Sequence, residues 1–236
     1  MWNIRGVKSR GAFERLKFLV ELHKVRLILL QEPFVDDGTI ESYTRRIAYD
    51  GCYANVNGKI WFIWSSEVEV SIIADEEQQV TIVYAKNKGH LRATLWKSLK
   101  ICNNYINGPW CITGDFNVIM SSDEKKGENP HIMEKSWDFI ECMEECGMAD
   151  VGYTAPRFTW CNARDKWNRI WKRLDRVFVN HEWTSKTSRF NVEHMASTGS
   201  DHTHMLVKYS TTKNEGIKYF KFFKFWTEQP NFISVI

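Results

Sequence analysis

Two short apolar runs that end in acidic, turn-forming motifs constrain the fold of this chain most strongly. Residues 27–30 read Leu-Ile-Leu-Leu and run into Gln-Glu-Pro at 31–33, where the proline cannot continue a central strand. Residues 110–113 read Trp-Cys-Ile-Thr and run into Gly-Asp-Phe-Asn at 114–117. Continuous apolar runs of this length are typical of strands buried on both faces. Both motifs therefore predict a buried strand with a carboxylate at its C-terminal end.

The rest of the pattern mixes strand pairs with helices, without a strict repeat of strand, helix and strand. Helical spacing of apolar residues predicts helices over 11–23, 90–106 and 131–146, the last closed by Gly147. Asn57-Gly58 is a strong hairpin signal. The other predicted strands cover 2–5, 52–56, 60–64, 68–73, 80–84, 157–162, 170–180, 190–194 and 204–209. We expect an α+β protein in which two packed sheets carry helices on their outer faces.

Composition excludes several classes of protein. Of the 236 residues, 43% are hydrophobic and 26% are charged, as in soluble globular proteins, so global disorder is excluded. No apolar run approaches the ~18 residues that span a bilayer, and no secretory signal is evident. The six cysteines form no Cys-x-x-Cys pair, which argues against a zinc site and favours buried free thiols. The net charge of +3 is too small to identify a nucleic-acid-binding protein.

Acidic and amide side chains recur at the ends of the predicted strands. They are Asn3, Glu32, Asp115 with Asn117, Asp175, and Asp201 with His202. A carboxylate at the end of an apolar strand loses hydration unless it is paired or bound to a cation. Several on one edge favour Mg²⁺, which binds through one or two carboxylates and keeps waters for a substrate phosphate. Each motif taken singly is also compatible with an ordinary turn, a cap or a surface ion pair.

The order of these motifs resembles that of the endonuclease/exonuclease/phosphatase superfamily. Trp-Asn near the start, Gln-Glu after a buried strand, Gly-Asp-Phe-Asn, Arg-Leu-Asp-Arg and Ser-Asp-His follow one another in that order. The closer resemblance is to the apurinic-like endonuclease domain of plant non-LTR (LINE-type) retrotransposons, through Val83-Tyr84-Ala85, the segment 92–99 and Phe158-Thr159-Trp160. It covers residues 1–209 and implies a four-layered αββα sandwich, a deoxyribonuclease-like fold. It also implies phosphodiester hydrolysis that depends on Mg²⁺, or on Mn²⁺ in its place.

The resemblance implies a cation site and a site for the attacking water. Glu32 is the principal Mg²⁺ ligand, Asn3 supports the metal or the phosphate, and Asp201 lies close to the metal. Asp115 orients or deprotonates the water, and Asn117 fixes that geometry.

The same resemblance implies contacts to the scissile phosphate. Tyr84 contacts the phosphate, and His202 hydrogen-bonds it with Asp175 as the carboxylate that orients the imidazole. Thr159 and Trp160 support the wall of the site near the substrate.

A basic, aromatic stretch beside the predicted site favours DNA as the substrate. Trp167 and Trp171 are interleaved with six basic residues between 164 and 176, a composition that suits a DNA backbone. A solvated surface loop is the alternative interpretation. The superfamily fold also serves other phosphoesterases, so the fold alone does not identify the substrate. The retroelement-like motifs indicate DNA, which such an enzyme would nick for retroelement insertion. The residues predicted to bind substrate here are Arg164, Lys166, Arg169 and Arg176.

The sequence changes character from residue 210 onwards. Residues 210–216 are polar and turn-like, and residues 217–236 are aromatic and basic. We expect an endonuclease domain over residues 1–209. Residues 210–236 are expected to form a linker and tail at the start of a region that is missing here. In the retroelements that the sequence resembles, that region is a reverse transcriptase. DNA is the expected partner, with no membrane and no obligate protein partner, and an active copy would work in the nucleus. The alternative is a weak or inactive retroelement remnant with at most nucleic-acid binding.

Overall fold

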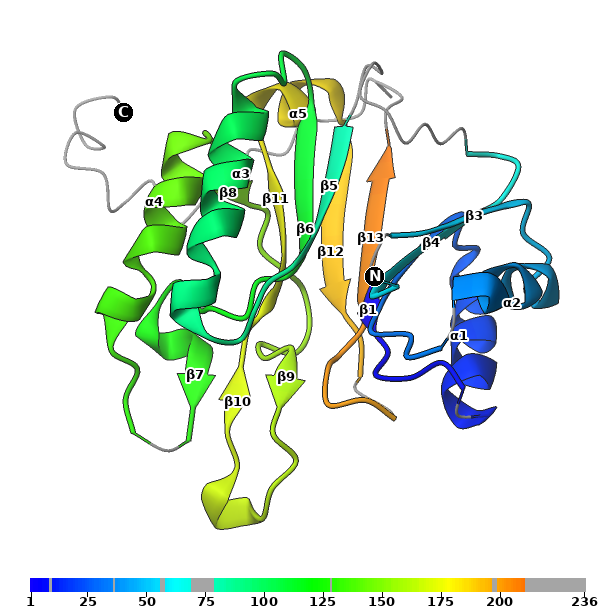
Figure 1. The fold of residues 1–236 in the computed structure, drawn as a ribbon, viewed down its shortest axis with the longest axis horizontal. Helices are drawn as coiled ribbons and strands as arrows, with labels where there is room; N and C mark the ends of the chain where they lie inside the picture. The colour runs from blue at the N-terminus through cyan, green and yellow to red at the C-terminus, as the bar shows by residue number, and fades with distance from the viewer. Residues whose placement is uncertain are drawn as a thin grey trace.

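The first part of the chain forms one sheet with helices on its outer side. The computed structural model describes residues 1–8, 10–35, 37–55, 58–68, 79–127, 129–196 and 199–210. In the first sheet the strand order is β1-β2-β4-β3, with β1 parallel to β2 and the other neighbours antiparallel. Helices α1 and α2 lie against this sheet (Figure 1). These elements are β1 (Trp2–Asn3), α1 (Arg10–His23), β2 (Leu27–Gln31), α2 (Ile40–Arg46), β3 (Gly51–Ala54) and β4 (Ile60–Trp64).

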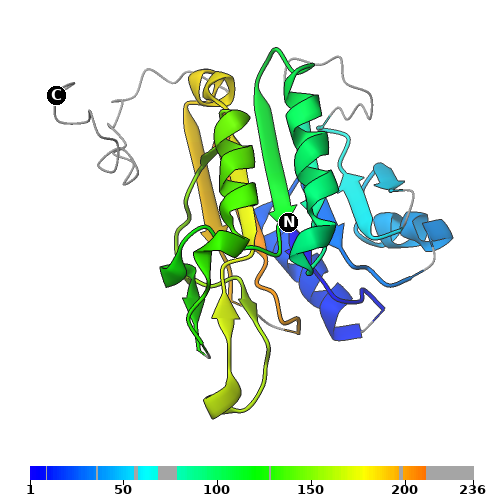
Figure 2. The ribbon, with the colours of Figure 1, turned by 60° about the vertical axis from the view of Figure 1, so that its left-hand side comes forward.

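The second sheet lies in the middle of the chain and carries its own pair of helices. Its strand order is β5-β6-β11-β8, with β5 parallel to β6 and β11 antiparallel to both of its neighbours. Helices α3 and α4 cover the outer face of this sheet (Figure 2). The elements are β5 (Gln79–Tyr84), α3 (Ala93–Asn103), β6 (Trp110–Asp115), α4 (Trp137–Glu145), β8 (Ala149–Asp150) and β11 (Asp175–Val179).

Smaller elements complete the fold. The hairpin of β12 and β13 continues the first sheet, because Trp2 of β1 bridges His204 and the backbone of Met1 pairs with Met205. Strands β7, β10 and β9 form a ladder whose β9–β10 end stands out from the body (Figure 1). Their bounds are β7 (Lys125–Lys126), β9 (Trp160–Cys161), β10 (Trp171–Lys172), α5 (His181–Lys186), β12 (Arg189–His194) and β13 (Met205–Ser210). Short 3-10 turns cover Asp37–Thr39, Gly89–Leu91, Ser122–Glu124, Met133–Lys135 and Lys166–Asn168.

Buried apolar side chains of the described residues gather in three clusters, one for each space between layers. The first, around Trp61, packs α1 and α2 on the first sheet, and the last, around Phe139, packs α3 and α4 on the second. The middle cluster joins the two sheets through residues such as Cys111, Val177 and Met205. Three interlayer cores require four layers, so the expected α+β sandwich of the αββα type is confirmed.

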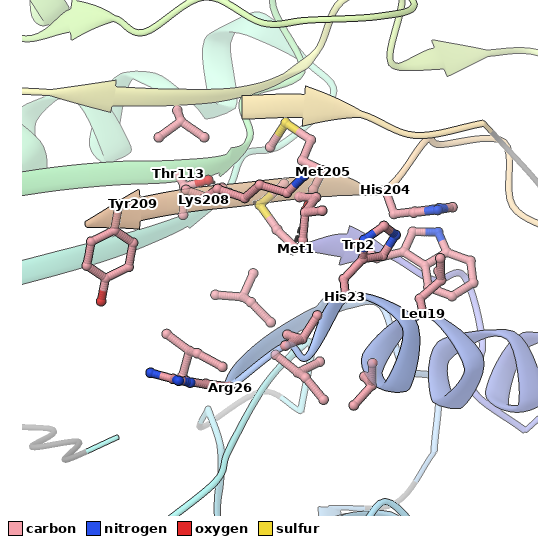
Figure 3. A pocket seen from close by; sticks show the side chains of 18 of the residues that line it. Met1, Trp2, Leu19, His23, Arg26, Thr113, His204, Met205, Lys208 and Tyr209 are labelled. Atoms are coloured by element: carbon pink, nitrogen blue, oxygen red, sulfur yellow. Dashed lines mark hydrogen bonds between the residues drawn. The ribbon is translucent and has the colours of Figure 1, made fainter. Parts of the chain in front are cut away.

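A cavity of about 860 Å³ lies between β2 and β13, next to the short β1. Figure 3 shows Met1 and Trp2 beside it, with His23 from α1 and His204 from the segment before β13. Strand β1 covers only Trp2–Asn3 and so is too short to fill the space between β2 and β13 along their whole length. The cavity lies where β1 is absent. Within the described residues, no helix is both long and apolar enough to cross a membrane.

Most predicted elements are present, but several bounds are wrong. The strand expected over 170–180 is two strands, since β10 pairs with β7 and β9 whereas β11 pairs with β6 and β8. The helices expected over 90–106 and 131–146 are shorter, and a separate 3-10 turn precedes each. Helices α2 and α5 were not predicted. Residues 69–78, and with them most of the strand expected over 68–73, lie outside the described residues, as do 56–57 and 211–236.

Candidate active site

Three neighbouring strands bring the central side chains together. Asp115 at the end of β6 is in register with Tyr84 at the end of β5 and with Asp175 at the start of β11. Adjacent strands in a sheet lie only about 5 Å apart, so this pairing alone gathers two carboxylates and a phenol at one edge. Asp115 and Asp175 are both almost completely buried.

The Gly-Asp-Phe-Asn motif fixes the orientation of Asp115. Asn117 donates its backbone N–H to Asp115 Oδ1 at 2.9 Å and its side-chain Nδ2 to Oδ2 at 3.1 Å, so both carboxylate oxygens are held. Asn117 itself has a φ of 52°, an unusual value for a non-glycine residue. Gly114 has a φ of 152°, and a Cβ there would collide with the backbone of Val83 on β5. The glycine is therefore needed for the close approach of β6 to β5.

His202 reaches this group from the segment that precedes β13. Its Nδ1 lies 2.9 Å from Asp175 Oδ2, and its Nε2 lies 3.9 Å from Asp115 Oδ2. Burial lowers the pKa of His202, but the charge and hydrogen bond of Asp175, with Asp115 and Asp201, outweigh it and raise the pKa to about 9. Burial, with the charge of Asp175, raises the pKa of Asp115 to about 7. The pair therefore supplies an imidazolium donor beside a carboxylate that can accept a proton near neutral pH.

Thr159 and Trp160 form the wall behind these groups. Thr159 Oγ1 accepts the backbone N–H groups of Leu174 and Asp175, at 2.9 and 3.0 Å. Trp160 Nε1 donates to Asp201 Oδ2 at 2.9 Å. Thr159, which was expected near the substrate, is completely buried, so its side chain supports the wall by holding the backbone that carries Asp175 and is not itself open to substrate.

A second polar group comes from the first sheet. Asn3 on β1 is in register with Gln31, and Glu32 follows directly, so the amide and the carboxylate emerge from neighbouring strands. Tyr84 donates its hydroxyl to Glu32 Oε1. Burial, followed by that hydrogen bond and the charge of Glu32, raises the pKa of Tyr84, which remains a neutral donor. Arg5 Nε lies 3.2 Å from Glu32 Oε2 and 2.9 Å from Asp201 Oδ1.

This second group has the donor set that a hard cation needs. Asn3 Oδ1, Glu32 Oε2 and Asp201 Oδ1 are buried oxygen atoms without a hydrogen-bond partner among the described residues. Buried oxygens without partners are costly, and a cation would satisfy them. Among the described residues no cluster of three or more His, Cys, Asp or Glu side chains could hold a metal. Two carboxylates and an amide still fit Mg²⁺, which retains several waters.

A cavity of about 320 Å³ opens over these residues. It is smaller than the cavity beside β1, but it reaches part of the candidate site, because Glu32, Tyr84 and Asp115 line it. Arg5, Lys59 and Lys86, which the sequence did not single out, also line it and make its mouth basic. Arg92 also lies at the site, although the sequence marks it only as the first residue of the segment 92–99. Its Nη1 donates to the backbone oxygens of Lys86, Asn87 and Asn117 and fastens two loops of the site.

The basic stretch divides into an exposed part and a buried part. Arg164 and Arg169 are exposed on the β9–β10 projection, and Trp167 at its tip is 90% exposed. The side chain of Lys166 lies outside the described residues. Arg176 does not bind substrate as predicted, because it is 1% exposed and pairs with Glu124 and Asp150.

A family model described as Endonuclease/Exonuclease/phosphatase family matches residues 2–202 of this chain. The chain belongs to this family. The predicted family is thereby confirmed, and with it the general activity of hydrolysing phosphate esters. The matched region of this family member runs from β1 to His202 and so contains every site residue described above. Among curated proteins, no sequence is similar enough to count as a match.

Solved structures share the fold of this family member at low sequence identity. The 3′ phosphatase NExo from Neisseria, bound to a product DNA hairpin, has 14% identity and a TM-score of 0.66 over 89% of this chain and 97% of that one. The endonuclease domain of TRAS1, a telomere-specific non-LTR retrotransposon, has 15% identity and a TM-score of 0.61 over 87% and 95%. An AP endonuclease from Archaeoglobus fulgidus has 16% identity and a TM-score of 0.63 over 88% and 96%.

Proposed function

We propose that this family member is a divalent-cation-dependent endonuclease that nicks DNA, of the kind that retroelements use for insertion. The observation that carries the proposal is the meeting of Asp115, Asp175 and His202 in the same site as three buried oxygens that have no hydrogen-bond partner among the described residues. The first group suits proton transfer and phosphate binding, and the second suits a cation that neutralises phosphate charge. Phosphodiester hydrolysis needs both.

The residues divide the chemistry between them. Asp115, held by both donors of Asn117, takes the proton of the attacking water. His202, kept in one orientation by Asp175, donates from Nε2 to a phosphate oxygen in the transition state, where such a donor is worth ~10²–10³ in rate. Tyr84 remains protonated and donates to the phosphate or to Glu32.

Asn3, Glu32 and Asp201 would hold the cation. Mg²⁺, or Mn²⁺ in its place, would supply charge neutralisation on the non-bridging oxygens and aid the departing oxygen. The product would be a nick with a 3′-hydroxyl and a 5′-phosphate.

Two features support DNA as the substrate. The β9–β10 projection carries exposed Arg164 and Arg169 around the exposed ring of Trp167, and its base at Trp160 contacts the candidate cation ligand Asp201. Cationic side chains around an exposed aromatic ring suit a phosphate backbone and a groove. The structural neighbours support DNA too, since one is a 3′ phosphatase bound to a product DNA hairpin and another is the endonuclease domain of a non-LTR retrotransposon.

Nicking of supercoiled plasmid by the purified chain tests the proposal. We expect relaxed circles in Mg²⁺ and none in EDTA, with a rate loss on the order of 10²-fold or more in Glu32→Gln and Asp115→Asn. Glu41→Gln, which removes an exposed carboxylate on α2, is the matched control and should nick at the wild-type rate. A folded wild type that does not nick would favour the inactive remnant. Nicking that survives both substitutions would show that the assigned site is wrong.

A further inference from the structure

Arg5 stands between two carboxylates that the proposed function assigns to a cation. Its Nε lies 3.2 Å from Glu32 Oε2 and 2.9 Å from Asp201 Oδ1. The backbone on either side is fastened, since Ile4 N donates to Gln31 O at 3.0 Å and Gly6 N donates to Glu32 O at 2.9 Å. Arg5 has a φ of 50°, a costly conformation for a residue with a Cβ. The local fold thus fixes the backbone from which the Arg5 side chain reaches the two carboxylates.

The contact of Arg5 with the two carboxylates is one of charge and not of hydrogen bonding. Glu32 Oε2 and Asp201 Oδ1 lack a hydrogen-bond partner in the described part of the chain, although the Arg5 nitrogen is within ion-pair distance of both. Asn3 Oδ1 on the adjacent strand is buried and lacks a partner too. Arginine therefore offsets the two negative charges but leaves the oxygen lone pairs unsatisfied. A small cation with oxygen ligands would satisfy both requirements.

We propose that Arg5 takes the place of the divalent cation in the metal-free protein and competes with it. The inference rests on the proposed metal dependence and adds the residue that sets cation affinity. Arginine cannot lose its charge, so the guanidinium and a divalent cation cannot share Glu32 and Asp201. When the cation binds, Arg5, whose side chain is 44% exposed, turns away from the two carboxylates and further into the cavity that it lines with Lys59 and Lys86. There it adds to the positive charge that faces a phosphate backbone.

Titration calorimetry with Mn²⁺ in the absence of DNA tests the competition without any activity measurement. Arg5→Gln removes the competing charge, and we expect it to bind Mn²⁺ about three- to tenfold more tightly than wild type, as for the loss of two partly exposed ion pairs. Arg5→Lys keeps the charge and should stay closer to wild type. Arg26→Gln is the matched control, because it removes an exposed arginine paired with Glu67 outside the site. The rise in Tm that Mn²⁺ produces should be larger in Arg5→Gln than in wild type.

The outcomes separate this inference from the proposed function. Equal Mn²⁺ affinity in wild type and Arg5→Gln, or weaker binding in Arg5→Gln, would overturn the competition and leave the metal-dependent function standing. Binding of Mn²⁺ to none of the proteins would overturn both. If Arg5→Gln does not fold alone, competition predicts that Mn²⁺ restores its folding by replacing the missing positive charge. Failure of Mn²⁺ to do so would overturn it.

Discussion

At the scale of single residues, the candidate site concentrates backbone conformations that cost energy. Arg5, Glu32 and Asn117 all have φ values between 50° and 52°, and none is a glycine. Each such residue costs on the order of 1–3 kcal/mol and persists only where its surroundings hold it. Here hydrogen bonds between the segments around residues 4–7 and 31–33, and from Asn117 to Ala85 and Asp115, do so. These backbone conformations bring the side chains of Arg5 and Glu32 within ion-pair distance of each other.

Thr159 is the residue whose loss should separate positioning from contact. Thr159→Val keeps the shape but leaves the N–H groups of Leu174 and Asp175 without their acceptor. We expect the free energy of unfolding to fall by about 1–3 kcal/mol for each orphaned group, with a lower kcat and an unchanged KM. Urea unfolding and nicking kinetics measure both. Thr159→Ser retains the acceptor oxygen and should recover most of the lost stability and most of the lost kcat. A Thr159→Val variant as stable and active as wild type would refute the positioning role of Thr159.

At the scale of elements, a buried ring of charges joins the 3-10 turn Ser122–Glu124, β8 and the start of β11. Glu124 and Asp150 each give one oxygen to Arg173 and one to Arg176. The two arginines flank Leu174 and Asp175, where the chain passes from β10 to β11 and so from one ladder to another. Burial disfavours these charges, yet their pairing compensates, so the ring locks the β9–β10 projection to the strand that carries Asp175.

The ring should make stability depend on pH in the acid range. Burial alone would raise the pKa of Glu124 and of Asp150, but Arg176 and Arg173 lower each below its usual 4.5 and 3.8. The unfolded chain therefore takes up protons first, so this stability is complete above about pH 5 and is lost as pH falls through the folded pKa values. Glu124→Gln should be less stable at pH 7 and show a shallower loss below pH 5. Parallel slopes in urea unfolding from about pH 3 to 7 would contradict it.

At the scale of the whole molecule, the site exists only where the two sheets meet. The first sheet supplies Asn3 and Glu32, and the second supplies Asp115 and Asp175. The segment that returns to β13 supplies Asp201 and His202, and it is tied to β9 by the bridge of Trp160 with His202 and to the first sheet by the bridge of Trp2 with His204. The proposed proton transfer thus depends on packing between elements far apart in the chain.

The pH dependence of nicking should report this assembly. Asp115 must lose its proton to act as the base, and its pKa is raised to about 7. His202 must keep its proton to act as the donor, and its pKa is raised to about 9. We expect kcat to rise with pH through the first value and to fall through the second, as a bell-shaped profile. Asp175→Asn should move the alkaline limb to lower pH; an alkaline limb that does not move would refute the coupling of Asp175 to His202.

The sequence by itself determined which strands are buried and which acids end them, because continuous apolar runs and the glycine and proline that follow them are local signals. Those signals predicted the buried strands that end at Glu32 and Asp115 and two packed sheets with helices outside. The resemblance of the ordered motifs implied the role of His202, the αββα layering and the family. The sequence could not show that residues 170–180 change ladder, that Arg176 and Thr159 are buried, or that Arg5 stands between Glu32 and Asp201. Those facts depend on which distant segments lie side by side. The positive charge of an arginine suits a DNA backbone, a buried carboxylate and a site that would otherwise bind a cation. Only tertiary packing decides which of these three an arginine contacts.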